Sequence, residues 1–147
     1  MEQWLPVWEI TIGAAALIVS LLFHGFGMAL VQRKHRDYMR LRPFRFGRQL
    51  TFSVLILLLI ATHLIEVLLW AASLQAVGAI TQFRHAFYYV AVTYTTLGYA
   101  EGTLSLQWRI LAPMMAMSGV FAFGWTTSVL FAIVSENSKA DSDLDAE

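Results

Sequence analysis

Three long apolar segments constrain this chain more than any other feature of its sequence. They cover residues 10–31, 50–74 and 108–134, and each reaches the roughly 20 apolar residues that a helix needs to cross a bilayer. Hydrophobic residues make up 58% of the 147 positions and charged residues only 14%, whereas soluble domains carry about 25% charged residues. We therefore predict an all-α, multi-pass membrane protein with three transmembrane helices, located in the cell (inner) membrane.

The distribution of charge predicts the orientation of these helices. Residues 32–49 carry seven of the ten Lys and Arg residues and a single acid, Asp37. Basic loops stay on the cytoplasmic side, so we expect the N-terminus, with Glu2 and Glu9, to lie outside and the C-terminus to be cytoplasmic. A position between two apolar segments favours this reading over a nucleic-acid-binding patch, and membrane lipid headgroups are the expected partner instead. The basic residues are Arg33, Lys34, Arg36, Arg40, Arg42, Arg45 and Arg48.

The two ends of the chain are expected to add no further domain. The N-terminus lacks the basic region of a secretory signal, so residues 1–31 are predicted to contain a retained transmembrane helix. The tail, residues 135–147, holds five acids against Lys139 and is predicted to be disordered, without a folded cytoplasmic ligand domain. Because the chain has no cysteine and no hydrolase motif such as HExxH, we do not expect an enzyme.

A fourth apolar stretch, residues 83–95, is too short to cross the membrane. As a helix it measures only about 20 Å, so it must enter from outside and return, which is possible only where protein or water covers the backbone. With its carboxyl end directed inward, the negative end of the helix dipole stabilises a cation at the membrane centre. The residues that follow are then expected to climb outward as an extended wall of carbonyl groups, and four such chains are needed to enclose a pore.

The residues that follow this short helix carry a specific motif. Residues 95–101 read Thr-Thr-Leu-Gly-Tyr-Ala-Glu. Together with the short helix and the two flanking spans, this motif resembles the pore loop of the potassium-channel superfamily. The whole chain is similar to small bacterial potassium-channel-like proteins with one helix added before the two-helix core. The resemblance implies that residues 50–134 form a pore module of outer helix, pore helix, filter and inner helix, assembled as a homotetramer.

The resemblance also assigns individual positions in the filter. Backbone carbonyls there replace the water shell of a dehydrated cation, so potassium or sodium ions are expected in the filter and no other cofactor. Glu101 stands at the outer mouth in place of the usual aspartate. Ala100 replaces a glycine that the family requires for a positive φ, and weakened selectivity is therefore expected. The filter residues are Thr95, Thr96, Leu97, Gly98, Tyr99 and Ala100.

Two glycines and a run of hydroxyl side chains mark the third span. Gly119 and Gly124 lie near and below mid-membrane, where channel inner helices bend, and they are predicted to form a hinge. An equally open alternative is that they permit close helix packing. The hydroxyls of residues 126–128 are expected to face the lower cavity or to bond to carbonyls one helical turn earlier.

His63 and Glu66 are the polar residues of the second span with the clearest structural meaning. They are three residues apart and share one helix face, and such groups tend to face the bundle interior. We predict that they brace the filter through a pore-loop donor such as Tyr88, Tyr94, Arg84 or a filter amide. A metal or proton site is the alternative.

His24 in the first span raises the possibility of a metal-binding triad with His63 and Glu66. Counting about 21 Å down from the outer end of the first span and about 20 Å up from the inner end of the second leaves a vertical gap of about 10 Å. No metal site is therefore predicted. Instead, His24 is expected to be hydrogen-bonded within a stripe of small residues that packs against the second span. This stripe consists of Gly13, Ala16, Ser20 and Gly27.

These features lead to one function and two alternatives. A homotetrameric cation channel, most consistent with potassium conduction, is the preferred hypothesis. A non-conducting regulatory or assembly subunit is the first alternative, because Ala100 disturbs the filter. An intramembrane metal-dependent enzyme or sensor that uses His63 and Glu66 is the second. The first span lacks the spaced arginines of a voltage sensor, so the sequence does not indicate the gating stimulus.

Overall fold

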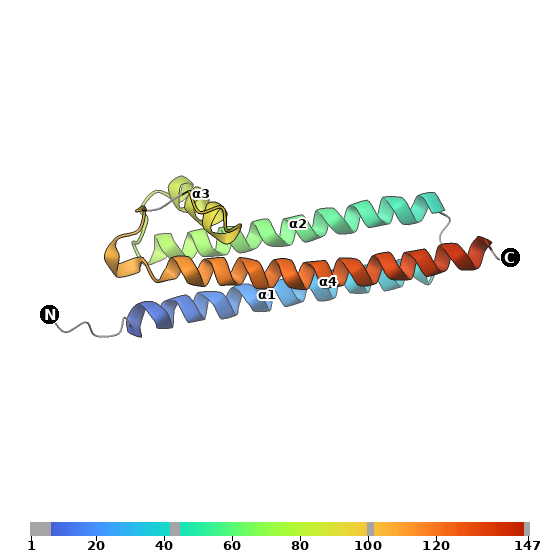
Figure 1. The fold of residues 1–147 in the computed structure, drawn as a ribbon, viewed down its shortest axis with the longest axis horizontal. Coiled ribbons are helices and arrows are strands. Elements are labelled where there is room, and N and C mark those ends of the chain that lie inside the picture. The colour runs from blue at the N-terminus through green and yellow to red at the C-terminus, as the bar shows by residue number, and fades with distance from the viewer. Residues whose placement is uncertain (1–6, 42–44, 100–101, 146–147) are drawn as a thin grey trace.

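The computed structural model describes residues 7–41, 45–99 and 102–145. Within these residues the chain contains helices and no strand. The helices are α1 (Val7–Met39), α2 (Arg45–Ala76), α3 (Phe83–Tyr94), the short 3₁₀ helix η1 (Leu106–Trp108) and α4 (Leu111–Asp145). Three long helices run side by side, and α3 lies at the end of the molecule opposite the C-terminus (Figure 1).

Three helices in the described part of the chain are long and apolar enough to cross a membrane, which confirms the predicted number of spans. They fall within Val7–Met39, Gln49–Ala76 and Leu106–Ala140. α1 and α2 extend into the basic stretch predicted as a loop, so that only residues 40–44 separate the two helices. Lys and Arg are favourable helix formers, and a basic stretch can therefore continue a helix beyond the bilayer.

The acidic tail is helical where disorder was expected. α4 runs without interruption to Asp145, because extending an existing helix adds one hydrogen bond for each residue ordered. A contact between two helices also holds the start of the tail, since Nε2 of the buried His35 on α1 lies 3.0 Å from Oε2 of Glu136. The prediction of a disordered tail therefore does not match the described residues.

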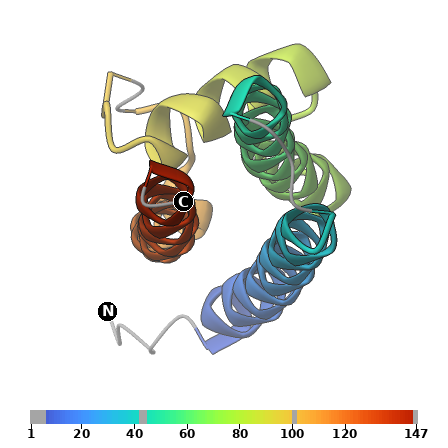
Figure 2. The ribbon, with the colours of Figure 1, turned by 90° about the vertical axis from the view of Figure 1, so that its right-hand side faces the viewer.

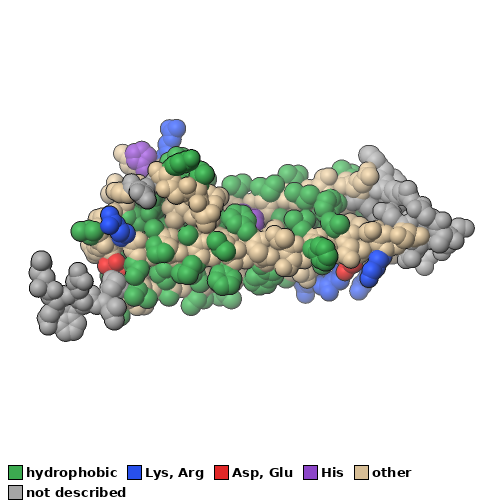
Figure 3. Space-filling model, viewed as in Figure 1, with side chains coloured by type: hydrophobic (Ala, Val, Ile, Leu, Met, Phe, Trp, Pro, Cys, Tyr) green, Lys and Arg blue, Asp and Glu red, His purple; other side chains and the backbone are tan. Residues whose placement is uncertain are grey.

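The arrangement of the helices places α3 over the carboxyl-terminal half of α2 and the amino-terminal half of α4. Seen along the bundle, α1, α2 and α4 form a triangle and α3 lies across α2 and α4, on the side away from α1 (Figure 2). Hydrophobic side chains cover the middle of the visible surface, whereas Lys and Arg lie toward its two ends (Figure 3). This distribution is the one expected of a molecule whose middle faces lipid.

The buried residues form two apolar cores, one at each end of the bundle. The core near α3 includes Trp70, Tyr94 and Met115, and the core near the connection between α1 and α2 includes Met28, Leu55 and Val129. Polar side chains lie between them. The packing therefore leaves a polar layer at mid-height in an otherwise apolar bundle.

The stripe of small residues on α1 packs against two helices, although the sequence predicted only one. Gly13 contacts Met114 of α4, whereas Gly27 contacts Thr62 of α2. Between them, the hydroxyls of Ser20 and Ser118 lie 3.2 Å apart. α1 therefore sits in the groove between α2 and α4 and is as much a partner of α4 as of α2.

Candidate functional site

The short helix α3 (Phe83–Tyr94) ends one residue before the helix predicted over residues 83–95. It begins after Gln82, whose backbone is extended, and ends at Tyr94. Its buried residues include Ala86, Val90 and Tyr94, which are four residues apart and therefore share one helix face. That face joins the apolar core near α3, and the carboxyl end of α3 is thereby held against α2 and α4.

α3 ends in a turn that places an unusual residue in the left-handed conformation. The N–H of Leu97 donates to the carbonyl of Val92 at 2.9 Å, and the N–H of Thr96 donates to the carbonyl of Thr93 at 3.0 Å. This bonding pattern is a Schellman motif, in which the left-handed residue is usually glycine. Here that residue is Thr96, with a φ of 60°.

α2 ends in the same motif with the expected residue. There the N–H of Ala79 donates to the carbonyl of Leu74 at 2.9 Å, and Gly78 has a φ of 71°. A β-branched residue in this conformation is an outlier, whereas glycine adopts it without steric cost. The comparison within one chain identifies Thr96 as a strained position at the start of the candidate filter.

The candidate filter residues lie together at the surface of the single chain. Residues 95–99 are exposed, and the exposed fractions reach 58% for Leu97 and 81% for Tyr99. Gly98 also has a positive φ, 76°. Ala100 and Glu101 lie outside the described residues, so the predictions for the outer filter position and the outer mouth stay predictions.

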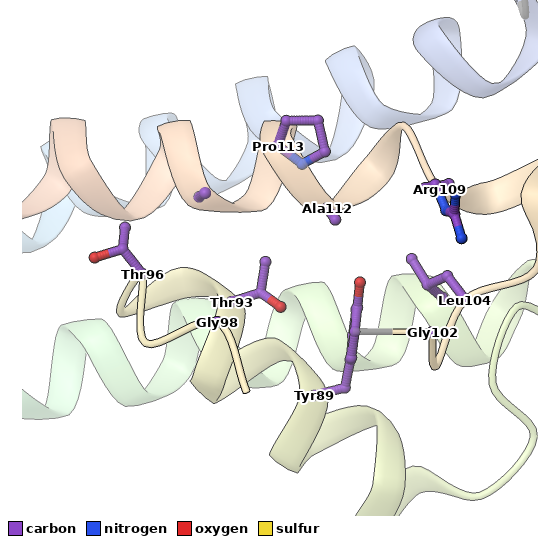
Figure 4. Close-up of a pocket in the computed structure, with 10 residues that line it drawn as sticks. Tyr89, Thr93, Thr96, Gly98, Gly102, Leu104, Arg109, Ala112 and Pro113 are labelled. Carbon is purple, nitrogen blue, oxygen red and sulfur yellow. The ribbon is translucent and has the colours of Figure 1, made fainter. Parts of the chain in front are cut away.

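A cavity of 860 Å³ lies beside these residues. Figure 4 shows Tyr89 and Thr93 of α3 on one side of it, Pro113 of α4 on the other, and Arg109 near one end. Thr96 and Gly98 of the candidate filter also line this space. The single chain therefore presents the candidate filter next to an open hollow.

Behind α3 lies a buried polar cluster, which we define as His24, His63, Glu66, Tyr94 and Thr126. The Tyr94 hydroxyl donates to Oε2 of Glu66 and lies 3.0 Å from Nδ1 of His63. Glu66 is fully buried and Tyr94 almost so. The contact between Glu66 and Tyr94 that the sequence suggested is thus present, and its role as a brace for the filter stays a prediction.

His24 belongs to this cluster, and the predicted separation of about 10 Å was wrong. Its Nδ1 lies 3.0 Å from Oε1 of Glu66, and the ring centroids of His24 and His63 are 5.3 Å apart. The error arose because one height was counted from the outer end of a span and the other from the inner end, so that uncertainties at both ends added together. α1 and α2 are joined by a short connection, and counting from it places both histidines at similar heights.

Thr126 joins the two histidines, and sequence reasoning did not assign it this role. Its Oγ1 lies 3.0 Å from Nε2 of His63 and 3.4 Å from Nε2 of His24. By contrast, Thr127 and Ser128 donate to carbonyls one turn earlier, at 2.8 and 3.1 Å, as one of the two expectations stated. The sequence could have indicated this role only through the height of the Thr126 hydroxyl, which equals that of the two histidines. Recognising that match requires the relative heights of the three helices.

The two glycines of α4 differ in their surroundings. A side chain at Gly119 would overlap with the backbone carbonyl of Tyr94, whereas a Cβ at Gly124 would meet nothing within 4 Å. α4 is continuous through both positions. Close packing therefore accounts for Gly119, and the hinge stays a prediction for both residues.

Comparison with known proteins identifies the family of this chain. A family model described as "Ion channel" matches residues 53–136, which is more than half of the chain. The match includes most of α2, all of α3, the candidate filter and α4 as far as Glu136, whereas α1 lies before it. No curated protein and no solved structure gave a match. The chain belongs to the ion channel family, as a potassium-channel-like two-helix domain preceded by one additional transmembrane helix.

Proposed function

We propose that this protein is a homotetrameric channel that conducts potassium with weakened selectivity. Membership of the ion channel family makes a cation channel the general expectation. The observation that carries the finer proposal is that a helix too short to cross the membrane ends directly at an exposed Thr-Thr-Leu-Gly-Tyr segment. A filter needs this geometry, because carbonyls must reach the pore axis at the end of a helix whose dipole favours a cation.

The strained backbone at Thr96 supports a functional role for this segment. A left-handed conformation costs an L-residue about 1–2 kcal/mol relative to glycine, and such strain clusters at functional sites. Thr96 occupies a position that Gly78 fills in the equivalent motif of α2. We attribute the threonine to its hydroxyl, which in our proposal faces the innermost ion site.

The exposed surface around the filter supports assembly into a tetramer. Leu97 and Tyr99 are large and more than half exposed, and Thr96 and Gly98 of the same segment line the cavity of 860 Å³ (Figure 4). A single filter segment gives only one wall of a narrow pore. Rotational symmetry then supplies the other walls from three further copies.

Ion flux in liposomes tests this proposal. We expect wild-type protein to pass potassium faster than sodium, and Ala100→Gly to sharpen the preference, since glycine accepts the positive φ that the family requires at this position. Ala76→Gly, an alanine-to-glycine change at the exposed end of α2, is the matched control and should leave the ratio unchanged. Equal, strongly potassium-selective flux in wild type and Ala100→Gly would contradict weakened selectivity.

The same experiment separates the channel from a non-conducting subunit. Wild-type protein that assembles but passes neither cation would refute conduction. If Ala100→Gly then restored flux, the native chain would be a channel-like subunit whose filter is disabled at Ala100.

A further inference from the structure

The buried polar cluster behind α3 has the composition and spacing of a metal site. His24, His63 and Glu66 each offer one ligand atom, and these atoms all lie within 4.8 Å of one another. The side chains of His24 and Glu66 have no exposed surface, and that of His63 is 16% exposed. Buried charges in proteins are normally paired or coordinate a metal.

Two atoms at the centre of the cluster lack the partners that burial requires. Nδ1 of His24 and Oε1 of Glu66 lie 3.0 Å apart, but neither makes a hydrogen bond. The distance is within hydrogen-bonding range, so the angle between the two groups is what does not fit a hydrogen bond. Two ligand atoms of one ion are close together without a hydrogen bond between them, because the lone pair of each is directed at the ion and not at the other ligand.

Thr126 holds the two imidazole rings in the orientation that metal binding needs. Its oxygen has two lone pairs and lies within reach of Nε2 of both histidines, while its hydroxyl is directed at the Met28 sulfur, 3.9 Å away. When Thr126 accepts from both Nε2–H groups, each Nδ1 carries a lone pair on the side of Glu66, and that of His63 also lies 3.0 Å from the Tyr94 hydroxyl. Metal-bound histidines usually donate their second N–H to such an oxygen.

We propose that His24, His63 and Glu66 bind a divalent transition metal ion, for which Zn²⁺ is the natural probe. In a tetrahedral zinc site with bonds of about 2.1 Å, ligand atoms lie about 3.4 Å apart. Here Nδ1 of His24 lies 3.0 Å from Oε1 of Glu66 and Nδ1 of His63 lies 3.4 Å from Oε2 of the same carboxylate. With one ligand atom taken from each residue, the three atoms lie within 4.8 Å of one another. Two imidazoles with one carboxylate form a donor set that suits zinc and related ions.

Tyr94 and Thr126 form the surrounding layer of this site. The Tyr94 hydroxyl holds Oε2 of Glu66 and thereby orients the carboxylate toward the two Nδ1 atoms. The ion also compensates the charge of Glu66, which is costly to bury alone in a membrane. An exchange of protons among the same side chains, with no metal, is the alternative that the experiment must exclude.

The location of the site gives the metal a structural consequence. His24 lies on α1, outside the matched channel region, whereas His63 and Glu66 lie on α2 and Tyr94 ends α3. One ion would therefore tie the additional helix to the pore helix directly behind the candidate filter. This inference concerns metal binding alone and does not depend on whether the protein conducts ions.

The test uses the full chain, purified in detergent, stripped with a chelator and dialysed against Zn²⁺ alone. Metal per chain is measured by mass spectrometry, and thermal unfolding is followed with and without zinc. We expect about one zinc per chain and a higher unfolding temperature in the wild type. The variants His24→Gln and Glu66→Gln should lose stoichiometric zinc and the zinc-dependent shift.

Two further variants provide a control and a graded test. His85→Gln removes an exposed histidine of α3 outside the cluster and should bind zinc as the wild type does. Thr126→Val keeps the three ligands but removes the shared acceptor, and we expect zinc affinity to fall about 10–100-fold, as is usual for this kind of partner. A purely structural cluster would show no zinc-dependent difference among these proteins.

A measurement on the wild type alone covers the case in which the ligand variants do not fold. Co²⁺ in a tetrahedral site with nitrogen and oxygen ligands gives a strong visible absorption, and we expect it to saturate at about one equivalent per chain and to disappear when zinc is added. Wild-type protein that takes up neither ion would overturn the proposal, as would full zinc binding in folded Glu66→Gln. Either result would leave proton exchange as the account of the cluster.

Discussion

At Gly119, α4 lies so close to α3 that an added Cβ would overlap with the backbone carbonyl of Tyr94. Because the atom that a Cβ would meet belongs to the Tyr94 backbone, the overlap cannot be relieved by rotating a side chain. We expect Gly119→Ala to lower the free energy of unfolding by about 1–3 kcal/mol through overpacking. Thermal unfolding in detergent measures this effect.

Gly124→Ala is the matched control on the same helix. The position is exposed and has open space around it, and alanine is a better helix former than glycine by about 1 kcal/mol. The expected result is unchanged or slightly increased stability. Equal destabilisation by both changes would show that the contact with Tyr94 is not what distinguishes Gly119.

Thr96 and Gly78 form a second matched pair, since both are the left-handed residue of a Schellman motif. We expect Thr96→Gly to raise stability by about 1 kcal/mol and Gly78→Ala to lower it by a similar amount, because only glycine avoids the steric cost. Thermal unfolding of both variants shows whether each change raises or lowers the stability. If Thr96→Gly is stabilising but slows ion flux, the strain is retained for function. If it destabilises the protein, the threonine is not strained.

At the scale of elements, the hydroxyl of Tyr94 links the carboxyl end of α3 to Glu66 of α2. Tyr94→Phe removes the donor to Glu66 while keeping the ring in the apolar core. We expect a loss of about 1–3 kcal/mol in stability, because a buried carboxylate oxygen loses its partner. Under the channel proposal, the ratio of potassium to sodium flux should also fall while the assembly stays intact.

A control for Tyr94→Phe is available on the same helix. Tyr88 is 62% exposed. Tyr88→Phe should therefore change neither the stability of the protein nor the ratio of potassium to sodium flux. A wild-type flux ratio in Tyr94→Phe would argue that α3 is positioned by packing alone and that Glu66 does not brace the filter.

The sequence predicted the elements well, for an identifiable reason. A short helix over residues 83–95 and three spans follow from the lengths of apolar runs, which the bilayer relates directly to structure. Lengths do not determine where helices end outside the membrane, and α4 therefore continued to Asp145 where disorder was expected. Local propensity and contacts such as His35 with Glu136 decide those ends.

The cluster of five polar residues was predictable only in part. His63 and Glu66 could be placed together because they share a helix face. Tyr94 could be named among their partners because it lies at the end of the neighbouring short helix. His24 and Thr126 required the vertical offset of three helices, which is set by contacts such as Gly27 against Thr62. A single sequence does not contain this offset in any periodic pattern, and a shift of two turns, about 11 Å, is enough to separate the residues.

At the scale of the whole molecule, the surface of the single chain predicts its assembly. Exposed apolar residues on the outside of a membrane protein face lipid and need no partner. Tyr99, however, belongs to the candidate filter and is 81% exposed, and its neighbour Gly98 lines a cavity. A filter segment bordered by lipid would leave backbone groups without partners. We therefore predict that these segments meet around a shared axis.

The test of this prediction combines mass and proximity. Native mass spectrometry of the 16.6 kDa chain should give a particle of four copies. The chain has no cysteine, so Tyr99→Cys introduces a single thiol that is expected to form disulfides between copies around the axis. Val19→Cys, at an exposed position on α1, is the control and should stay reduced because the additional helix lies away from the filter. Particles that saturate at two or three copies would reject the tetramer, and disulfides that form equally well at both positions would reject the proposed arrangement around the filter.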